Sequence, residues 1–186
     1  MRVDRETARK NREAVVDAAA RLFREQGFDG IGIAPLMKQA GLTNGAFYKQ
    51  FESKEALGLE ATERALEQNQ TAWRETLETA QGDAISAFCK WYLAQDHIAH
   101  RGVGCAFSTL ASEAPRRGKK AEAIFADAIE QSLDLLGGYA PMDRAKALNL
   151  ISGLVGTLIL ARAVGDSDLR TEIVAAMTEG TSGLSR

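Results

Sequence analysis

Apolar residues recur at a spacing of three and four along nearly the whole chain, and this periodicity constrains the fold more than any other feature. In the first segment, Val15, Ala18, Ala19 and Leu22 are spaced so that they share one face of a helix. The chain has only three prolines and no alternating run of β-branched residues bounded by turns. An all-α fold is therefore predicted.

Glycine and proline residues divide this helical pattern into segments. Gly27 stands where a left-handed helix C-cap is expected, and Pro35 falls in a first helical turn, where its missing N–H costs no intrahelical hydrogen bond. The pattern predicts nine helices. They cover approximately residues 7–26, 33–40, 44–51, 54–80, 83–99, 105–113, 117–136, 142–164 and 168–179.

The stretch from Gly41 to Phe51 is the most informative part of the chain. Gly41 ends the second helix, Thr43 is an N-cap type of residue, and Leu42 and Phe47 have the spacing of a hydrophobic staple. Two short helices at a fixed angle are predicted. In a helix-turn-helix, the first such helix braces the second, whose N-terminal residues enter the major groove of DNA. An exposed helical hairpin without DNA-binding function would have the same spacing.

The helix-turn-helix hypothesis gives a role to each exposed position of the second short helix, with Phe47 and Phe51 as inward anchors. Hydroxyl groups and the N–H groups of a helix N-terminus suit phosphate oxygens, whereas Asn44 and Lys49 can reach base edges. The small residues at 45 and 46 allow close approach to the groove. The predicted DNA-binding residues are Thr43, Asn44, Gly45, Ala46, Tyr48, Lys49 and Lys54.

The composition argues against several other classes of protein. Apolar residues make up 45% and charged residues 26%, as in soluble globular proteins. The longest apolar stretch, residues 150–161, is shorter than the ~20 residues of a membrane span, and no secretory signal is visible, so a cytoplasmic location is expected. The sequence has no phosphate loop, dinucleotide fingerprint or nucleophile elbow. Neither an enzyme nor a bound cofactor is expected.

Three motifs in the first third of the chain match one known arrangement. Residues 19–28 follow the pattern Ala-x-x-Leu-Phe-x-x-x-Gly-Phe, residues 40–41 are Ala-Gly, and residues 45–54 follow Gly-x-x-Tyr-x-x-Phe-x-x-Lys. From about residue 7 to residue 66, the chain thereby resembles the TetR/AcrR family of transcriptional regulators. It departs from the family pattern at Gly32, where members often have Ser or Thr as the cap of the second helix. Glycine still caps a helix, so the departure affects only a phosphate contact.

The resemblance implies a division of the chain into two parts. Residues 5–51 are expected to form the helix-turn-helix DNA-binding domain, here called the head. Residues 52–186 are expected to form the ligand-binding and dimerisation domain, here called the body. The implied protein is a nine-helix homodimer that represses transcription at a palindromic operator in double-stranded DNA. An unknown small-molecule inducer bound in the body releases it, and no membrane takes part.

The resemblance also assigns roles within the body. Its last two helices are expected to form a four-helix bundle with those of a second copy, through Ile151, Val155, Leu158, Ile159, Ile173 and Met177. The inducer is expected among the preceding helices, at Phe88, Trp91, Tyr92, Gln95, Phe107 and Phe125. Both patterns have a second interpretation, because aromatic residues at helical spacing and an apolar helix are also typical of the core of a single chain.

Cys105 supports an alternative hypothesis, in which the protein is a thiol-based sensor of electrophiles or redox state. It follows Gly104 at the expected start of a helix, where free N–H groups and the helix dipole favour a thiolate. The Gly-Cys segment also resembles one in a branch of the TetR/AcrR family that senses electrophiles such as N-ethylmaleimide or quinones. The competing interpretation is a small buried packing residue. No metal site is predicted, because Cys89 lies ~12 Å along the helix axis from His97.

Overall fold

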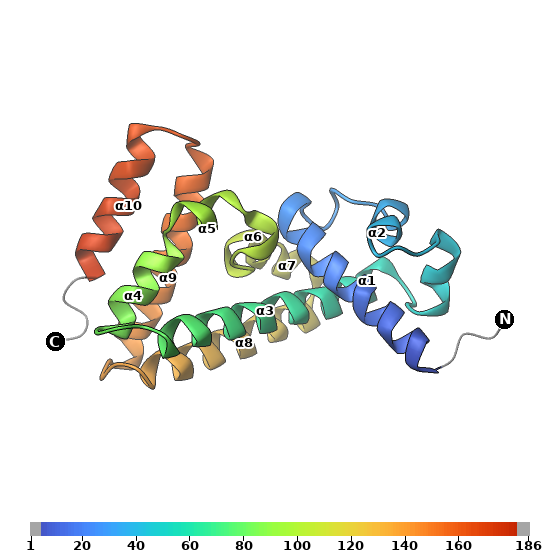
Figure 1. The fold of residues 1–186 in the computed structure, drawn as a ribbon, viewed down its shortest axis with the longest axis horizontal. Coiled ribbons are helices and arrows are strands. Elements are labelled where there is room, and N and C mark those ends of the chain that lie inside the picture. Colours follow the sequence, from blue (N-terminus) through green and yellow to red (C-terminus); the bar gives the residue numbers. More distant parts are fainter. Residues whose placement is uncertain (1–4, 182–186) are drawn as a thin grey trace.

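The structure, a computed structural model, describes residues 5–181, which form helices and turns without a strand. Figure 1 shows an elongated molecule with α1, α2 and η1 at one end, α4, α9 and α10 at the other, and α3 running between them beside α8. The predicted all-α fold is confirmed. The α-helices are α1 (Arg5–Gln26), α2 (Ile33–Gln39), α3 (Lys54–Glu78), α4 (Ala84–Tyr92), α5 (Gln95–Ala99), α6 (Phe107–Leu110), α7 (Ala114–Arg117), α8 (Lys119–Gly137), α9 (Arg144–Ala163) and α10 (Asp168–Thr181). The 3-10 helices are η1 (Asn44–Lys49), η2 (Arg101–Val103) and η3 (Ala111–Glu113).

The helices differ from the nine predicted ones at three places. The segment predicted at 83–99 is interrupted where the Leu93 N–H donates to the Cys89 carbonyl (3.0 Å) at the end of α4. Gly118 has a φ of +85° and separates α7 from α8, because a residue without a Cβ tolerates this backbone conformation. The segment predicted at 105–113 contains only the short α6 and η3. Residues 5–181 therefore contain ten α-helices and three 3-10 helices.

Side-chain caps define the starts of the long helices. The Ser53 hydroxyl accepts a hydrogen bond from the Ala56 N–H (3.0 Å) at the start of α3, and the Asp143 carboxylate accepts one from the Lys146 N–H (2.8 Å) at the start of α9. These bonds satisfy N–H groups that have no partner inside the helix. Gly27 ends α1 with a φ of +76°, as the sequence predicted.

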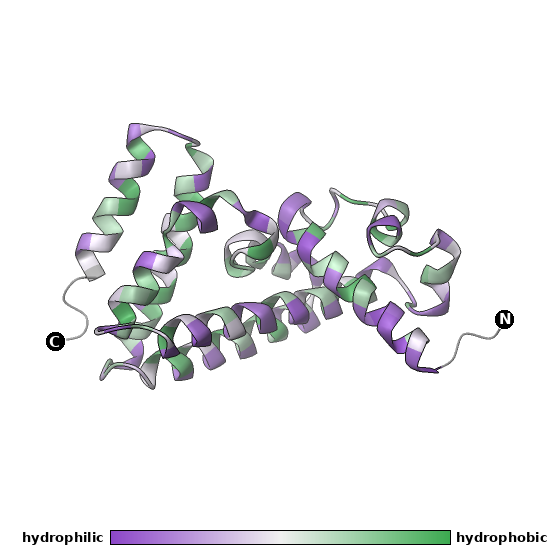
Figure 2. Ribbon diagram, in the orientation of Figure 1, coloured by the Kyte–Doolittle hydropathy of each residue, from purple (hydrophilic) through white to green (hydrophobic). Residues whose placement is uncertain are grey.

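A continuous apolar core extends from the α1, α2 and η1 end into the rest of the molecule. Figure 2 shows polar and apolar residues on different sides of α1 and α3, whereas α9 is apolar along much of its length. Within residues 5–181, α9 is the helix whose length and composition would suit a membrane span. It packs against α6, α8 and α10 in this fold, as the core helix of a folded domain does.

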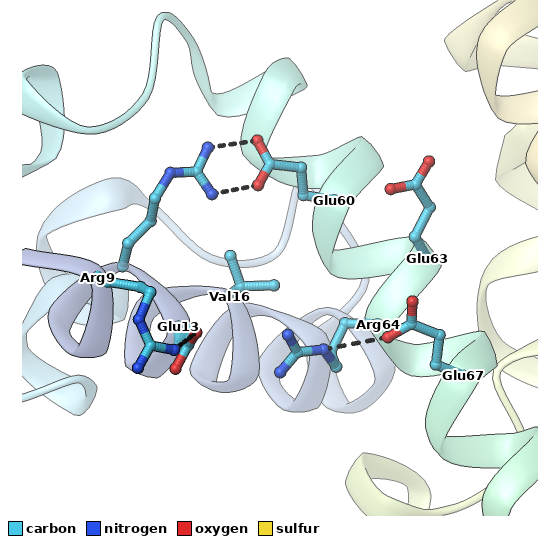
Figure 3. A pocket seen from close by; sticks show the side chains of 8 residues that line it. Arg9, Glu13, Val16, Glu60, Glu63, Arg64 and Glu67 are labelled. Carbon is cyan, nitrogen blue, oxygen red and sulfur yellow. Dashed lines mark hydrogen bonds and ion pairs between the residues drawn. The ribbon is translucent and has the colours of Figure 1, made fainter. Parts of the chain in front are cut away.

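Ion pairs join α1 to α3 at the surface (Figure 3). Arg12 forms a bidentate pair with Glu60, in which Nη2 lies 2.7 Å from Oε1, and its guanidinium lies 4.5 Å from the centroid of the Phe51 ring. The hydrogen bond to Glu60 raises the pKa of Arg12. Arg64 of α3 pairs with Asp17 of α1 at 2.5 Å. Partly exposed pairs contribute little stability each, so their main effect is to fix how α1 lies on α3.

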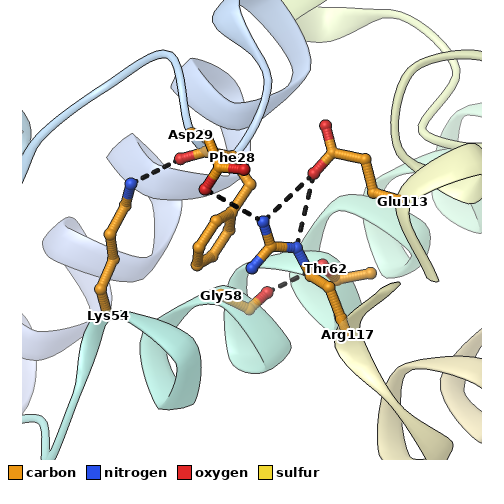
Figure 4. A network of polar contacts seen from close by, with 7 residues as sticks. All are labelled: Phe28, Asp29, Lys54, Gly58, Thr62, Glu113 and Arg117. Atoms are coloured by element: carbon orange, nitrogen blue, oxygen red, sulfur yellow. Dashed lines mark hydrogen bonds and ion pairs between the residues drawn. The ribbon is translucent and has the colours of Figure 1, made fainter. Parts of the chain in front are cut away.

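Phe28 fastens the end of α1 to two other helices (Figure 4). The Lys54 ammonium donates a hydrogen bond to the Phe28 carbonyl (2.6 Å), and the Arg117 guanidinium lies 3.1 Å from the centroid of the Phe28 ring. The ring packs directly on Gly58 of α3, where a Cβ would lie 2.1 Å from a ring carbon. We call Phe28, Lys54, Gly58 and Arg117 the Phe28 junction. It connects α1 to α3 and α7, and only glycine leaves room for it at position 58.

We expect Gly58→Ala to lower the free energy of unfolding by about 1–3 kcal/mol, because the added methyl group overlaps the Phe28 ring and overpacked cores are destabilised by this much. Urea unfolding followed by circular dichroism measures the change. The control is Gly137→Ala at the end of α8, where a Cβ would meet no atom within 4 Å. That variant should be unchanged or more stable by up to about 1 kcal/mol. Equal destabilisation of both variants would contradict the tight packing of Phe28 on α3.

Candidate nucleic-acid interface

The segment predicted as the recognition helix is η1, a single 3-10 helix after Thr43. Thr43 occupies the N-cap position with an extended backbone, and the Ala46 N–H donates to its carbonyl (3.0 Å). The Thr43 hydroxyl makes no capping hydrogen bond, so it is available to an external acceptor or donor. The exposed start of η1 therefore presents a hydroxyl and backbone N–H groups together, which suits phosphate oxygens.

Two aromatic anchors hold η1 on the core. Phe47 is fully buried, Phe51 is 4% exposed, and their rings stack at a centroid distance of 5.5 Å. Tyr48 is 70% exposed, and its ring makes a T-shaped contact with the Phe47 ring at a centroid distance of 5.2 Å. The alternation of buried and exposed aromatic residues is the one predicted for a helix that is anchored on one face and free on the other.

The structure brings most of the predicted DNA-binding residues to one exposed segment. Thr43, Asn44, Gly45, Tyr48 and Lys49 are exposed, and Ala46 is half-buried against the core. Lys54 is placed differently, since it is half-buried and its ammonium group is bonded to the Phe28 carbonyl. In this structure, Lys54 therefore contributes a hydrogen bond to the Phe28 junction.

Most residues predicted to bind an inducer lie in an aromatic cluster of the core. Trp73 of α3 lies 5.0 Å from Phe88, 5.8 Å from Tyr92 and 6.0 Å from Phe107, measured between ring centroids. Phe125 continues the cluster at 6.1 Å from Phe107. These predicted ligand residues are all buried and pack on one another, as in the second interpretation of the aromatic pattern.

The other two predicted ligand residues lie nearer the surface. Trp91 is half-buried, with its ring 6.0 Å from the Phe88 ring. Gln95 is exposed and lines a cavity of about 420 Å³ between α5 and α10, together with residues such as Ile98 and Val174. The sequence did not predict this cavity, because it depends on how α10 packs across α5.

The predicted dimerisation residues divide between the core and the surface. Leu158 is 0% exposed and Ile151 is 6% exposed, so both face the core of their own chain, and their role in dimerisation stays a prediction. Val155, Ile173 and Met177 are half-buried, and Met177 packs against Gly153. Ile159 is 45% exposed, and three leucines on α9 and α10 are also exposed. They are Leu148, Leu160 and Leu169.

Cys105 is buried, with 1% of its surface exposed, and it lies two residues before α6. Since α6 has only four residues, the helix dipole expected from the sequence is small. The Asn69 amide lies 3.4 Å from the Cys105 sulfur, and the Cys105 N–H donates to Nε2 of His97 (2.8 Å). Nδ1 of His97 is bonded to the Tyr92 carbonyl (2.7 Å). Both ring nitrogens of His97 are therefore engaged within the protein.

Two arginines flank this cysteine, of which Arg24 is buried and Arg162 is half-buried. Arg24 of α1 is 4% exposed, and burial lowers its pKa to about 10, an effect that negative charge at Cys105 opposes. Burial also lowers the pKa of Arg162 of α9, again opposed by Cys105. The neighbouring Tyr92 hydroxyl is buried, and its pKa is raised well above its ordinary value, mainly by burial and then by Cys105. No sequence motif singled out either arginine.

Burial also keeps His97 neutral, since it lowers the pKa of the imidazole. A neutral ring fits the geometry, in which one nitrogen donates to a carbonyl and the other accepts from an N–H. Among residues 5–181, no group of three or more His, Cys, Asp or Glu side chains is arranged to hold a metal ion. His97 instead fixes the backbone at Cys105.

This geometry defines an all-helical protein with an exposed helix-turn-helix at one end. Residues 15–61 match the family described as bacterial regulatory proteins, tetR family. The HTH-type transcriptional repressor NemR of Escherichia coli K12 is 29% identical over 90 residues, which are 48% of this chain and 45% of NemR. The HTH-type transcriptional regulator LmrA of Bacillus subtilis is 34% identical over 83 residues, 43% of this chain and 44% of LmrA. The matched region thus spans less than half the length of these relatives.

Solved structures extend the likeness of fold to nearly the whole chain. The reduced form of E. coli NemR has a TM-score of 0.78 at 19% identity, covering 95% of this chain and 97% of NemR. A TetR transcriptional regulator from Chloroflexus aurantiacus also has a TM-score of 0.78, at 23% identity and with 97% and 98% covered. Residues 15–61 thus match the TetR family, and the relatives that this part of the chain matches are transcriptional regulators.

Lys49→Ala is expected to weaken binding to a cognate site by about 1–3 kcal/mol, because a lysine that reads a base edge in the major groove contributes this much. Binding to random DNA should change much less. Fluorescence anisotropy with a site selected from a random pool, and with a scrambled duplex, measures both affinities. The control is Lys90→Ala on the exposed face of α4, which should leave both unchanged. Equal weakening on the two duplexes would remove the base-reading role of Lys49.

Proposed function

We propose that the protein is a transcriptional repressor that acts in the cytoplasm and binds a palindromic operator as a homodimer. The observation that carries the proposal is the exposed segment 43–49, which presents hydroxyl, amide and ammonium groups from a helix anchored by Phe47 and Phe51. In the proposed division, residues 5–51 read DNA and residues 52–186 bind ligand and dimerise. Residues 182–186 lie outside the described part of the chain.

The homodimer is supported by an exposed apolar face on α9 and α10. Leu148, Ile159, Leu160 and Leu169 are between 38% and 55% exposed, although apolar side chains of this size are usually buried. Ser152 and Gly156 lie between them on α9 and leave room for a second helix to approach closely. A two-fold dimer of helix-turn-helix heads contacts matching half-sites, which explains why a palindrome with half-sites ~10 bp apart is expected.

Release from DNA by a small-molecule inducer in the body completes the proposal. The cavity beside Gln95 has a volume within the usual range for small-molecule sites. The aromatic cluster around Trp73 is packed in this structure, so an inducer bound there would have to separate its rings. Such a separation would move α4 and α6 relative to α3, and α3 carries the Phe28 junction.

A second candidate function is a thiol sensor acting through Cys105. The observation that favours it is the set of groups around the sulfur: Asn69 donates toward it, Arg24 and Arg162 lie close enough to interact electrostatically, and the buried Tyr92 hydroxyl is beside it. Positive charge and hydrogen-bond donors stabilise a thiolate, which is the reactive form of cysteine. The solved NemR structure is named as a reduced form, which also fits a redox-responsive relative.

The chemistry of such sensing is an addition to an activated double bond. With N-ethylmaleimide, the Cys105 sulfur forms a bond to one alkene carbon, and the adjacent carbon takes up the thiol proton. The adduct is much larger than the space around a sulfur that is 1% exposed. It would displace Gly104, whose carbonyl accepts a hydrogen bond from Arg24 at the end of α1. Movement of α1 would then change the position of the head.

We expect Ile159→Asp to raise the dimer dissociation constant at least about tenfold, because it places an unpaired charge in an apolar interface. Since Ile159 is exposed in the single chain, the variant should keep its helical circular dichroism. Sedimentation equilibrium measures dimerisation, and a gel shift with the palindromic site should show a parallel fall in affinity. The control is Gln81→Asp, in the exposed turn after α3. A fully dimeric Ile159→Asp protein would exclude this face as the interface.

N-ethylmaleimide is expected to abolish operator binding by the wild type and by Cys89→Ser, but not by Cys105→Ser. Cys89 is a matched control because it is also 1% exposed in the wild type. Anisotropy before and after treatment measures the effect, and intact mass spectrometry counts the adducts. Equal loss of binding in all three proteins would show that alkylation acts elsewhere. If Cys105 is alkylated and DNA binding persists, the thiol is a packing residue, and a reversible inducer is the remaining explanation.

A further inference from the structure

A cavity of about 420 Å³ lies where α1 meets η2, α6 and α9. Its walls contain three arginines, Arg24, Arg101 and Arg162, together with Glu25 and an apolar side formed by Ile159 and Ala163. The volume is within the usual range for small-molecule sites. The cavity is separate from the aromatic cluster and from the cavity beside Gln95, since it shares no lining residue with either.

The two inner guanidinium groups of this cavity have neutral hydrogen-bond partners. Arg24 donates to the carbonyls of Ala20 and Gly104 and to Gln68 Oε1, at 2.6–3.1 Å. Arg162 donates to the carbonyls of His97 and Ile98 and to the Ser108 hydroxyl, at 2.7–3.0 Å. Within residues 5–181, no carboxylate forms an ion pair with either side chain or with Arg101. Buried cations without a counter-ion are unusual, because leaving water costs them much free energy.

The negatively charged groups nearby do not balance the positive charge of the three arginines. Glu25 is its one carboxylate wall residue, and that carboxylate already pairs with Arg21 at 3.6 Å. A thiolate at Cys105 would supply a single negative charge against three guanidinium groups. Burial lowers the pKa of Arg162, and the nearby positive charge of Arg101 lowers it further. The cavity is therefore cationic whether Cys105 is ionised or not.

The arginines of the cavity have N–H groups left to donate hydrogen bonds to a bound ligand. A guanidinium has five N–H groups, and Arg24 and Arg162 each use three of them in the bonds above, which leaves two on each. Arg101 is exposed on the short η2 and can turn toward the cavity without breaking a described hydrogen bond. Paired N–H groups of arginine match the two oxygens of a carboxylate.

We infer that this cavity binds a small organic carboxylate, with its charge on Arg24, Arg101 and Arg162 and its apolar part against Ile159 and Ala163. The bound anion joins α1, which carries the head, to α9 of the body. It thereby supplies the counter-ion that the buried Arg24 and the half-buried Arg162 lack. The three arginines belong to one chain and the binding requires no DNA, so it is tested apart from operator binding, although Ile159 is also assigned to the proposed dimer interface.

Calorimetric titration with benzoate tests the site, with benzyl alcohol as the neutral analogue and ionic strength held constant with chloride. Benzoate should bind and raise the thermal midpoint, whereas benzyl alcohol should do neither. Arg101→Gln should weaken benzoate binding about tenfold, because the glutamine amide replaces a charged hydrogen-bond donor with a neutral one. The control Arg74→Gln, on the exposed face of α3, should bind benzoate as the wild type does. Equal affinities of these two variants, or no advantage of benzoate over benzyl alcohol, would overturn the inference.

Ala163→Glu gives a second test, in which the protein supplies its own carboxylate. Ala163 is exposed at the wall of the cavity, so the change does not enlarge a buried residue. The variant should unfold at a higher temperature than the wild type without ligand, and it should no longer bind benzoate. A variant that is destabilised and still binds benzoate would contradict the site. If the anion site fails these tests but the Ala163→Glu variant still shifts DNA in a gel, the proposed repressor function stands.

Discussion

The packing of Phe28 against Gly58 is the contact on which the arrangement of α1, α3 and α7 depends. Phe28 follows the C-cap of α1, and its ring lies between α3 and the guanidinium of Arg117, while its carbonyl is bonded to Lys54. Elements from three parts of the chain meet at one aromatic side chain. Because the ring has no space to slide across α3, it fixes the position of the end of α1 relative to α3 and α7.

A second connection lies one turn earlier on α1, and it is polar. Arg24 reaches from α1 to the Gly104 carbonyl and to Gln68, while Arg162 ties α9 to the carbonyls of His97 and Ile98. Cys105 lies within this layer, and the cationic cavity opens beside it. The apolar junction gives α1 a firm position, whereas this layer makes that position sensitive to charge. An alkylated thiol or a bound anion would act on the same two arginines.

The helix-turn-helix segment could be predicted from the sequence because the residues that specify its turns and anchors are close together in the chain. Gly27, Gly41 and the motif from Gly45 to Lys54 specify turns and anchors within a few residues, and the structure has these turns at the expected places. Leu158 and Ile159 are adjacent and both apolar, so periodicity along an evenly apolar helix did not separate the buried residue from the exposed one. The aromatic residues of α4 and α6 were equally ambiguous, since the pattern of a ligand wall and that of a core are the same.

The sequence by itself determined the helical class, the position of the helix-turn-helix and the anchors Phe47 and Phe51, because hydrophobic periodicity and helix caps act over short distances. Only the tertiary structure decided that Lys54 faces Phe28, that Ile151 and Leu158 face inward, and that Arg24 and Arg162 share a cavity. Arg24 and Arg162 lie far apart in the chain, and their proximity depends on how α1 and α9 pack. Side chains that meet across such distances leave no local pattern in a single sequence.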